Sequence, residues 1–105
     1  MSQPVIYNVT VSIDYEVHGD WLAWMKDIHI PDVMKTGFFT EFKFSRILAE
    51  EEGGMTYSIM YTAKSMAALN EYQAFHSPAL QKEHNDKYGG KFAAFRTLLE
   101  IVDHG

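Results

Sequence analysis

Three histidines are the residues of this 105-residue chain best placed for acid–base chemistry or metal binding. His29, His76 and His84 each fall on the predicted inner face of a helix. An imidazole there can donate or accept a proton near neutral pH if its surroundings shift its pKa only slightly. We expect His29 to face the core, either as a general acid or base in a cavity or as a core histidine that bonds backbone groups next to Pro31.

The same three histidines could converge on a metal ion, but their spacing matches no local ligand motif. The nearby carboxylates are expected to point elsewhere on their helices. The chain has no cysteine, which excludes iron–sulfur clusters, Cys-ligated zinc and thiol catalysis. We therefore expect no metal site, and we interpret His76 as a helix C-terminal residue stabilised by the helix dipole.

Arg96 lies on a predicted strand, where a charged side chain needs a partner. Glu100, Asp14 or Glu41 could pair with it, within the chain or across a dimer. The alternative is that Arg96 binds an anionic ligand through a bidentate contact. Carboxylates are numerous in this chain, so an ion pair is the favoured interpretation.

Aromatic and amide side chains on neighbouring predicted strands form a second candidate site. They are Tyr7, Asn8, Tyr57 and Tyr61, with Trp21 and Trp24 beside them on the first predicted helix. With His76 and Arg96 they make up the candidate ligand-binding residues, and His29 is the candidate catalytic residue. Such a concavity would suit a flat hydrophobic ligand, although the same residues would also form an ordinary aromatic core.

Nucleotide-binding and nucleophile motifs are missing from the sequence. Gly53-Gly54 and Gly89-Gly90 are isolated pairs, which we interpret as a hairpin turn and a helix end. No serine stands in a G-x-S-x-G elbow. Bulky neighbours surround each helical histidine and leave no room for a porphyrin, so we expect no haem and no other cofactor.

The composition is typical of one compact domain over residues 1–105, with 47% hydrophobic and 22% charged residues. The net charge of −5 argues against nucleic acid or an anionic membrane as the partner. The first four residues lack a leader pattern, and no apolar run approaches the ~20 residues of a membrane span. We expect a cytoplasmic protein.

The hydrophobic pattern predicts strands and helices in the order strand, helix, strand, strand, two helices, strand. The expected ranges are 4–15, 21–29, 38–48, 55–63, 65–76, 77–88 and 92–102. Asp20 and Ser65 are the predicted N-caps of two helices. Pro31 is expected to kink the first helix, and Gly37 to close the turn that follows.

This order predicts a ferredoxin-like βαββαβ fold of the α+β class, with a four-stranded antiparallel sheet. We expect the first and last strands at its centre and the helices on one face only. The other face would then carry Met60, Leu98 and Val102 among Thr and Ser, and an apolar patch in water is unfavourable. We therefore expect a homodimer that packs sheet to sheet, with a small hydrophobic ligand as a further candidate partner.

Several short segments resemble a bacterial family known only as a domain of unknown function. They are Tyr7-Asn8-Val9-Thr10-Val11, Trp21-Leu22-Ala23-Trp24-Met25 followed by His29-Ile30-Pro31, Thr36-Gly37, Glu52-Gly53-Gly54-Met55-Thr56-Tyr57, His76-Ser77-Pro78-Ala79-Leu80 and Phe95-Arg96-Thr97-Leu98-Leu99-Glu100. That family is similar to the dimeric α/β-barrel superfamily, which includes cofactor-free and haem-degrading monooxygenases, muconolactone-type isomerases and proteins without known activity. The resemblance implies the fold and a dimer, and it assigns no catalytic residue.

Two functions fit these observations. One is a non-catalytic or accessory binding module with a small aromatic-lined cavity. The other is a cofactor-independent monooxygenase- or isomerase-like enzyme that acts on a small aromatic compound with His29 as acid or base. An open pocket of a few hundred Å³ that reaches His29 would favour the enzyme, and a continuous packed core at His29 would favour a non-catalytic protein.

Overall fold

The computed structural model describes residues 3–49 and 51–105, so Glu50 of the predicted hairpin connection lies outside the described residues. The elements in chain order are β1 (Val5–Asp14), α1 (Tyr15–Trp24), the π-helical segment η1 (Met25–His29), α2 (Ile30–Lys35), β2 (Phe39–Arg46), β3 (Gly54–Ala63), α3 (Met66–Phe75), α4 (Ser77–Tyr88) and β4 (Phe92–Glu100). In these ranges, no helix is long and apolar enough to cross a bilayer.

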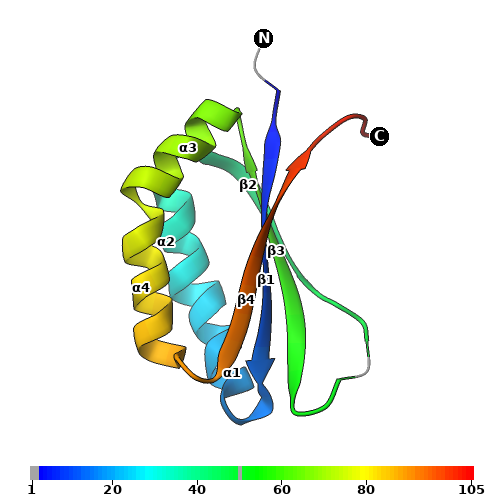
Figure 1. Ribbon diagram of the computed structural model, residues 1–105, viewed down its shortest axis with the longest axis vertical. Helices are drawn as coiled ribbons and strands as arrows, with labels where there is room; N and C mark the ends of the chain where they lie inside the picture. Colours follow the sequence, from blue (N-terminus) through cyan, green and yellow to red (C-terminus); the bar gives the residue numbers. More distant parts are fainter. Residues whose placement is uncertain (1–2, 50) are drawn as a thin grey trace.

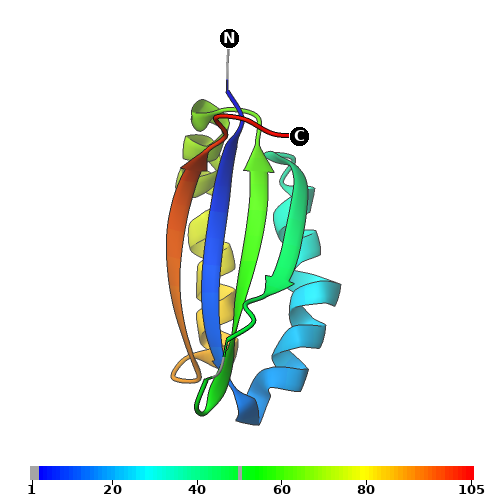
Figure 2. The same ribbon diagram turned by 90° about the vertical axis from the view of Figure 1, so that its right-hand side faces the viewer.

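The four strands form one antiparallel sheet in the order β2-β3-β1-β4. All the helices lie on one face of it, and the other face is uncovered (Figures 1 and 2). The expected ferredoxin-like α+β fold is therefore confirmed. The expectation that the last strand is central is wrong, because β4 lies at an edge. The crossover from β1 to β2 leaves room for one strand between them, and β3 fills that position antiparallel to both.

The first helix begins six residues earlier than the sequence predicts. Tyr15 is exposed at the start of α1 instead of continuing the strand, and Asp14 is the N-cap. Val17 is half-buried and Trp21 is buried, and this spacing of four residues places both side chains on one face of the helix. Packing of that face against the sheet outweighs the low helix propensity of Gly19. Asp20, predicted as the N-cap, lies inside the helix and accepts a hydrogen bond from the Tyr88 hydroxyl at 2.6 Å.

Pro31 does not end the helix in a kink. The helix instead widens over η1, where the Ile30 N–H donates to the carbonyl of Met25, five residues earlier. Pro31 has no N–H, and its ring would press on the carbonyl of Asp27 in a regular α-helix. The wider turn accommodates the proline, and α2 continues to Lys35. Gly37 then ends the turn with a φ of +82°, as expected.

The remaining boundaries follow the sequence closely. The Ser65 hydroxyl accepts a hydrogen bond from the Ala68 N–H at 3.1 Å, which confirms the predicted N-cap of α3. The core lies between the sheet and the helices, and its largest fully buried side chains come from both layers. They are Trp21, Ile13, Ile30, Ile59, Leu69 and Val33.

The register of the edge strand β4 differs from the prediction in one important respect. Arg96 lies opposite Val9, and Leu98 lies opposite Tyr7. Residues directly opposite in an antiparallel pair share a face, so both side chains are on the helix-covered face. Leu98 was expected on the uncovered face and is not there, and Val102 lies beyond the end of β4. Phe95 and Leu99 occupy the uncovered face instead.

Candidate functional site

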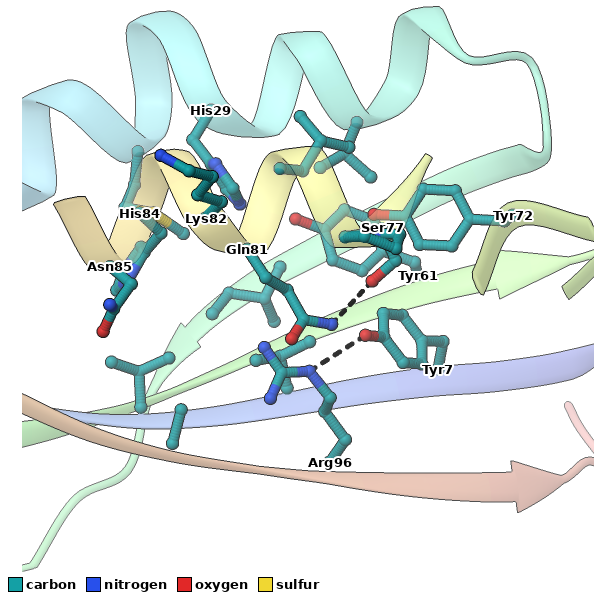
Figure 3. Close-up of a pocket in the computed structure, with 18 of the residues that line it drawn as sticks. Tyr7, His29, Tyr61, Tyr72, Ser77, Gln81, Lys82, His84, Asn85 and Arg96 are labelled. Carbon is teal, nitrogen blue, oxygen red and sulfur yellow. Dashed lines mark hydrogen bonds between the residues drawn. The ribbon is translucent and has the colours of Figure 1, made fainter. Parts of the chain in front are cut away.

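A pocket of about 400 Å³, partly open to solvent, lies between the sheet and the helices. Figure 3 shows the side chains that converge on it from both layers. Its residues come from all strands except β2 and from most of the helical segments. They are Tyr7, Val9, Val11, Met25, His29, Val33, Ile59, Tyr61, Tyr72, Ser77, Pro78, Leu80, Gln81, Lys82, His84, Asn85, Phe92, Ala94 and Arg96. The sheet and α2 supply mainly apolar walls, and α4 supplies a polar side.

The π-helical segment η1 places His29 in this pocket. Its ring stacks on Trp24, five residues earlier, with centroids 5.0 Å apart and an angle of 30° between the planes. A π-turn brings residues five apart into line, and such turns are frequent at functional sites. The Nδ1 atom of His29 is buried and has no hydrogen-bond partner among residues 3–49 and 51–105.

Burial lowers the pKa of His29 to about 4, against a partial opposing effect from the Asp32 carboxylate. The ring is therefore neutral at physiological pH. It is available as a hydrogen-bonding group but is a weak base.

His84 lies next to His29 and is fixed by a tryptophan. The Trp21 Nε1–H donates to His84 Nε2 at 2.9 Å, so the neutral His84 ring carries its proton on Nδ1. The His29 and His84 centroids are 5.7 Å apart. Burial, with smaller effects from protonated His29 and from the Arg96 guanidinium, lowers the pKa of His84 to about 4.

Three tyrosines from different elements line the opposite end of the pocket. The Tyr7 ring lies 6.2 Å from Tyr61 and 5.9 Å from Tyr72, between ring centroids. Burial raises the pKa of Tyr61 and of Tyr72 well above the usual range for a phenol. These hydroxyls stay protonated at neutral pH and can donate hydrogen bonds to a ligand.

Arg96 points from β4 into the pocket toward Tyr7 and Gln81 (Figure 3). Its Nε donates to the Tyr7 hydroxyl at 3.0 Å. The favoured pairing of Arg96 with Glu100, Asp14 or Glu41 is not found, since the described residues contain no salt bridge to Arg96. The reason is the register of β4, which places Arg96 beside a phenol and above the pocket.

The structure brings together four of the nine predicted site residues and places five elsewhere. Tyr7, His29, Tyr61 and Arg96 line the pocket. Asn8 is on the uncovered face, where it accepts a hydrogen bond from the Ser58 hydroxyl at 2.6 Å.

The other aromatic candidates belong to the surrounding packing. Trp21 is fully buried and packs on Tyr57, with centroids 5.2 Å apart. Trp24 supports His29 from outside the pocket, and His76 stacks near Tyr72 at 6.3 Å. A role for these residues in ligand binding stays a prediction.

Sequence reasoning missed the polar side of the pocket. Tyr72, Ser77, Gln81, Lys82 and Asn85 line it from α3 and α4. Ser77, Gln81 and Asn85 follow one another at intervals of four, which is the spacing of one helix face. That stripe adjoins the apolar stripe of α4 and is the signal that could have found them. The Gln81 amide donates to the Ser77 hydroxyl at 2.6 Å, so the two side chains form one polar surface.

A metal centre finds no support in this arrangement. Within the part of the chain that the structure describes, no group of three or more His, Asp or Glu side chains is placed to hold an ion.

The fold and this pocket define a small ferredoxin-like α+β protein with a site between its helices and its sheet. Residues 4–102 match the family described as Domain of unknown function (DUF4286), so the chain belongs to that family. A search of curated protein sequences found no match.

Solved structures with the same fold come from proteins of several kinds. SnoaB from Streptomyces nogalater, a cofactor-independent oxygenase in its N63A variant, is 10% identical with a TM-score of 0.67 over 95% of each chain. A hydroxynitrile lyase from Passiflora edulis is 13% identical with a TM-score of 0.71 over 100% of this chain and 99% of its own. A dimeric ferredoxin-like protein from an uncultured marine organism is 11% identical with a TM-score of 0.60 over 98% and 100%. At such identities the likeness establishes the fold alone.

Proposed function

We propose that this protein binds a small, flat, largely apolar molecule in the pocket between its sheet and its helices. The observation that carries the proposal is the pocket itself, which has aliphatic and aromatic walls and a few convergent polar groups. Ligand sites of proteins typically combine these features at volumes of ~300–1,000 Å³. A fully packed core at His29 would have argued against it.

Binding is better supported than catalysis because the two buried imidazoles are weak bases. Burial lowers the pKa of both His29 and His84 to about 4. An efficient general base at neutral pH has a pKa closer to 7. As neutral rings they are suited to accept or donate hydrogen bonds, which is the behaviour of a binding module.

A second candidate is a cofactor-independent monooxygenase- or isomerase-like enzyme with His29 as the acid or base. The opening of the pocket to His29 favours it. Two proteins with this fold are described as enzymes, a cofactor-independent oxygenase and a hydroxynitrile lyase. A negatively charged substrate beside His29 would raise the pKa of the ring toward the useful range.

We further propose that each chain forms one domain over residues 1–105 and that two copies pair through their uncovered sheet faces. Large apolar side chains on this face include four that we call the apolar rim: Ile6, Met60, Phe95 and Leu99. Burying such a rim is favourable in water. The neighbour described as a dimeric ferredoxin-like protein supports self-association. Light scattering should give twice the mass of the 12.1 kDa chain, at low and at high salt. A monomer at micromolar concentration contradicts the dimer.

Fluorescence of N-phenyl-1-naphthylamine, a neutral aromatic probe, tests the binding proposal. We expect a saturable increase for the wild type. Ala94→Trp should fill the pocket and weaken binding at least tenfold, whereas Ala74→Trp on the exposed side of α3 should bind like the wild type. Thermal melts of both variants check that they are folded. Equal binding by the two variants, or no saturable binding by the wild type, contradicts the proposal.

Proton exchange separates the two candidate functions. With 2-tetralone, a flat ketone that has acidic C–H bonds, an enzyme-like site should accelerate exchange of deuterium from solvent. The acceleration should disappear in His29→Phe. A binding module should bind the ketone and leave its exchange rate unchanged, which proton NMR can measure.

A further inference from the structure

The charge of the pocket is opposite to that of the protein. The chain has a net charge of −5, yet no Asp or Glu is found among the described residues that line the pocket. Two cations, Arg96 and Lys82, do line it. The Lys82 ammonium is already held by the Asp86 carboxylate at 2.6 Å, whereas Arg96 has no carboxylate partner among the described residues. Arg96 is therefore the cation whose charge is available to a ligand.

The guanidinium of Arg96 is oriented but not neutralised. Its Nε donates to the Tyr7 hydroxyl at 3.0 Å, and the Tyr7 side chain is buried, so this contact holds the group in place. The two Nη groups, which carry the remaining four N–H bonds, have no hydrogen-bond partner in residues 3–49 and 51–105, and Arg96 is an exposed residue that a ligand entering from solvent can reach. A planar guanidinium with both Nη groups free matches the two oxygens of a carboxylate.

The electrostatic effect of Arg96 extends across the pocket. Its charge contributes to the lowered pKa of His29 and His84 on one side, and on the other side it offsets part of the rise that burial causes in the pKa of Tyr72. Ser77 and Pro78, the first residues of the twelve-residue helix α4, line the same pocket. The N-terminal end of a helix adds partial positive charge there. The surroundings thus favour a negative charge, and the neutral tyrosine hydroxyls can donate to it.

We propose that the ligand of this pocket is an aromatic carboxylate, with its carboxylate on the Nη groups of Arg96 and its rings against the apolar walls. This inference rests on the proposed binding function and specifies the class of ligand. The rings would lie among Ile59, Tyr61 and Leu80, where apolar and aromatic side chains offer contact area. A single arginine suits the single charge of a carboxylate, whereas phosphate groups are usually held by several donors.

Calorimetric titration with 2-naphthoate and with its neutral amide, 2-naphthamide, tests the charge preference. The two compounds have the same rings and nearly the same shape. We expect the wild type to bind the carboxylate at least tenfold more tightly than the amide. Equal affinities overturn the aromatic-carboxylate inference and leave the binding proposal intact. If neither compound binds and N-phenyl-1-naphthylamine also fails to bind, both proposals are overturned.

Variants of Arg96 test the position of the charge. Arg96→Gln should reduce naphthoate binding to the level of the amide and leave amide binding within twofold of the wild type. Arg96→Lys should give an intermediate loss, because it keeps the charge and loses the bidentate geometry. The matched control is Lys43→Gln, which removes one exposed cation from β2, on the uncovered face. An equal effect of Arg96→Gln and Lys43→Gln overturns the inference.

Histidine titration locates the bound anion. With saturating 2-naphthoate, the NMR titration midpoints of His29 and His84 should move upward, because a nearby negative charge favours the protonated rings. The amide should leave the midpoints unchanged. A naphthoate that binds without moving either midpoint lies outside this pocket, and that result also overturns the inference.

Discussion

The two faces of the sheet are built from the same strands but are organised in different ways. On the covered face, odd-numbered residues of β1 and β3 pack against the helices and leave one pocket whose polar groups converge. On the uncovered face, even-numbered residues form a strip of hydrogen-bonded polar side chains, flanked by the apolar rim. Its members include Asn8, Thr10, Ser12, Thr56 and Ser58.

The difference lies in how the polar groups are satisfied. In the polar strip each group has a neighbour on the same or the adjacent strand, such as Ser12 and Thr56 with hydroxyl oxygens 2.7 Å apart. In the pocket, the buried Nδ1 atom of His29 has no partner among the described residues, and the guanidinium of Arg96, an exposed residue, contacts only the Tyr7 hydroxyl there. A buried polar atom without a partner needs an explanation, and a ligand in the pocket would supply one.

Adjacent residues on β3 provide the largest contrast. Ile59 is 1% exposed in the core, and Met60 is 36% exposed on the other face. Ile59→Ala should lower the free energy of unfolding by about 2–5 kcal/mol, because it removes buried methyl groups and leaves a cavity. Met60→Ala should cost less than about 1 kcal/mol per chain. Urea denaturation measures both, and equal losses would mean that the two faces are equally buried.

Acid should lower the free energy of unfolding through His29 and His84 on the covered face, because the polar strip contains no group that titrates in this range. The pKa of His29 and His84 is about 4 in the folded protein and about 6.5 when unfolded, so the unfolded chain binds more protons between these values. The neutral rings contribute fully to the free energy of unfolding above pH 6.5. This contribution is lost as the pH falls to 4, and the loss is on the order of 1–2 kcal/mol for each ring.

A non-titrating variant isolates this effect. His84→Gln keeps a hydrogen-bond acceptor for Trp21 and should flatten the dependence of unfolding free energy on pH between 6.5 and 4. His104→Gln, at the exposed C-terminal end, should leave the slope unchanged. A slope that is the same in His84→Gln and in the wild type would contradict the lowered pKa.

A charge in the apolar rim should break the proposed dimer without affecting the pocket. Phe95 is 62% exposed on the uncovered face. Because a symmetric interface contains each residue twice, Phe95→Lys should raise the dimer dissociation constant by about 10–100-fold. Sedimentation analysis measures the constant, and N-phenyl-1-naphthylamine binding should stay within twofold of the wild type. If Phe95→Lys leaves the dissociation constant unchanged, the interface lies elsewhere.

The polar strip gives the smallest expected effect. Ser58→Ala removes the hydrogen bond that the Ser58 hydroxyl donates to Asn8 and should lower the free energy of unfolding by about 1 kcal/mol. The matched control is Ser45→Ala, an exposed serine on the same face of β2, which should change it by less than about 0.5 kcal/mol. Chemical denaturation at one protein concentration compares the two, and a larger loss for Ser45→Ala would contradict the role of the polar strip.

The element types and the class of fold follow from local patterns in the sequence. Alternation along β1 and β3, the Ser65 cap and the glycine after the first helical region are local signals, because they depend on side-chain periodicity and backbone preference. For the same reason, the sequence identified His29 and His84 as inward-facing residues on their helices.

Only the tertiary structure decided how these elements combine. The register of β4 placed Arg96 opposite Val9 and over the pocket instead of in an ion pair, and no local pattern encodes a register between strands so far apart in the chain. The same holds for the π-turn, where the apolar face of the helix and Pro31 together determine the position of His29. The pocket exists because side chains from three strands and several helical segments do not completely fill the space between the sheet and the helices. The volume that stays unfilled depends on the packing of the whole domain.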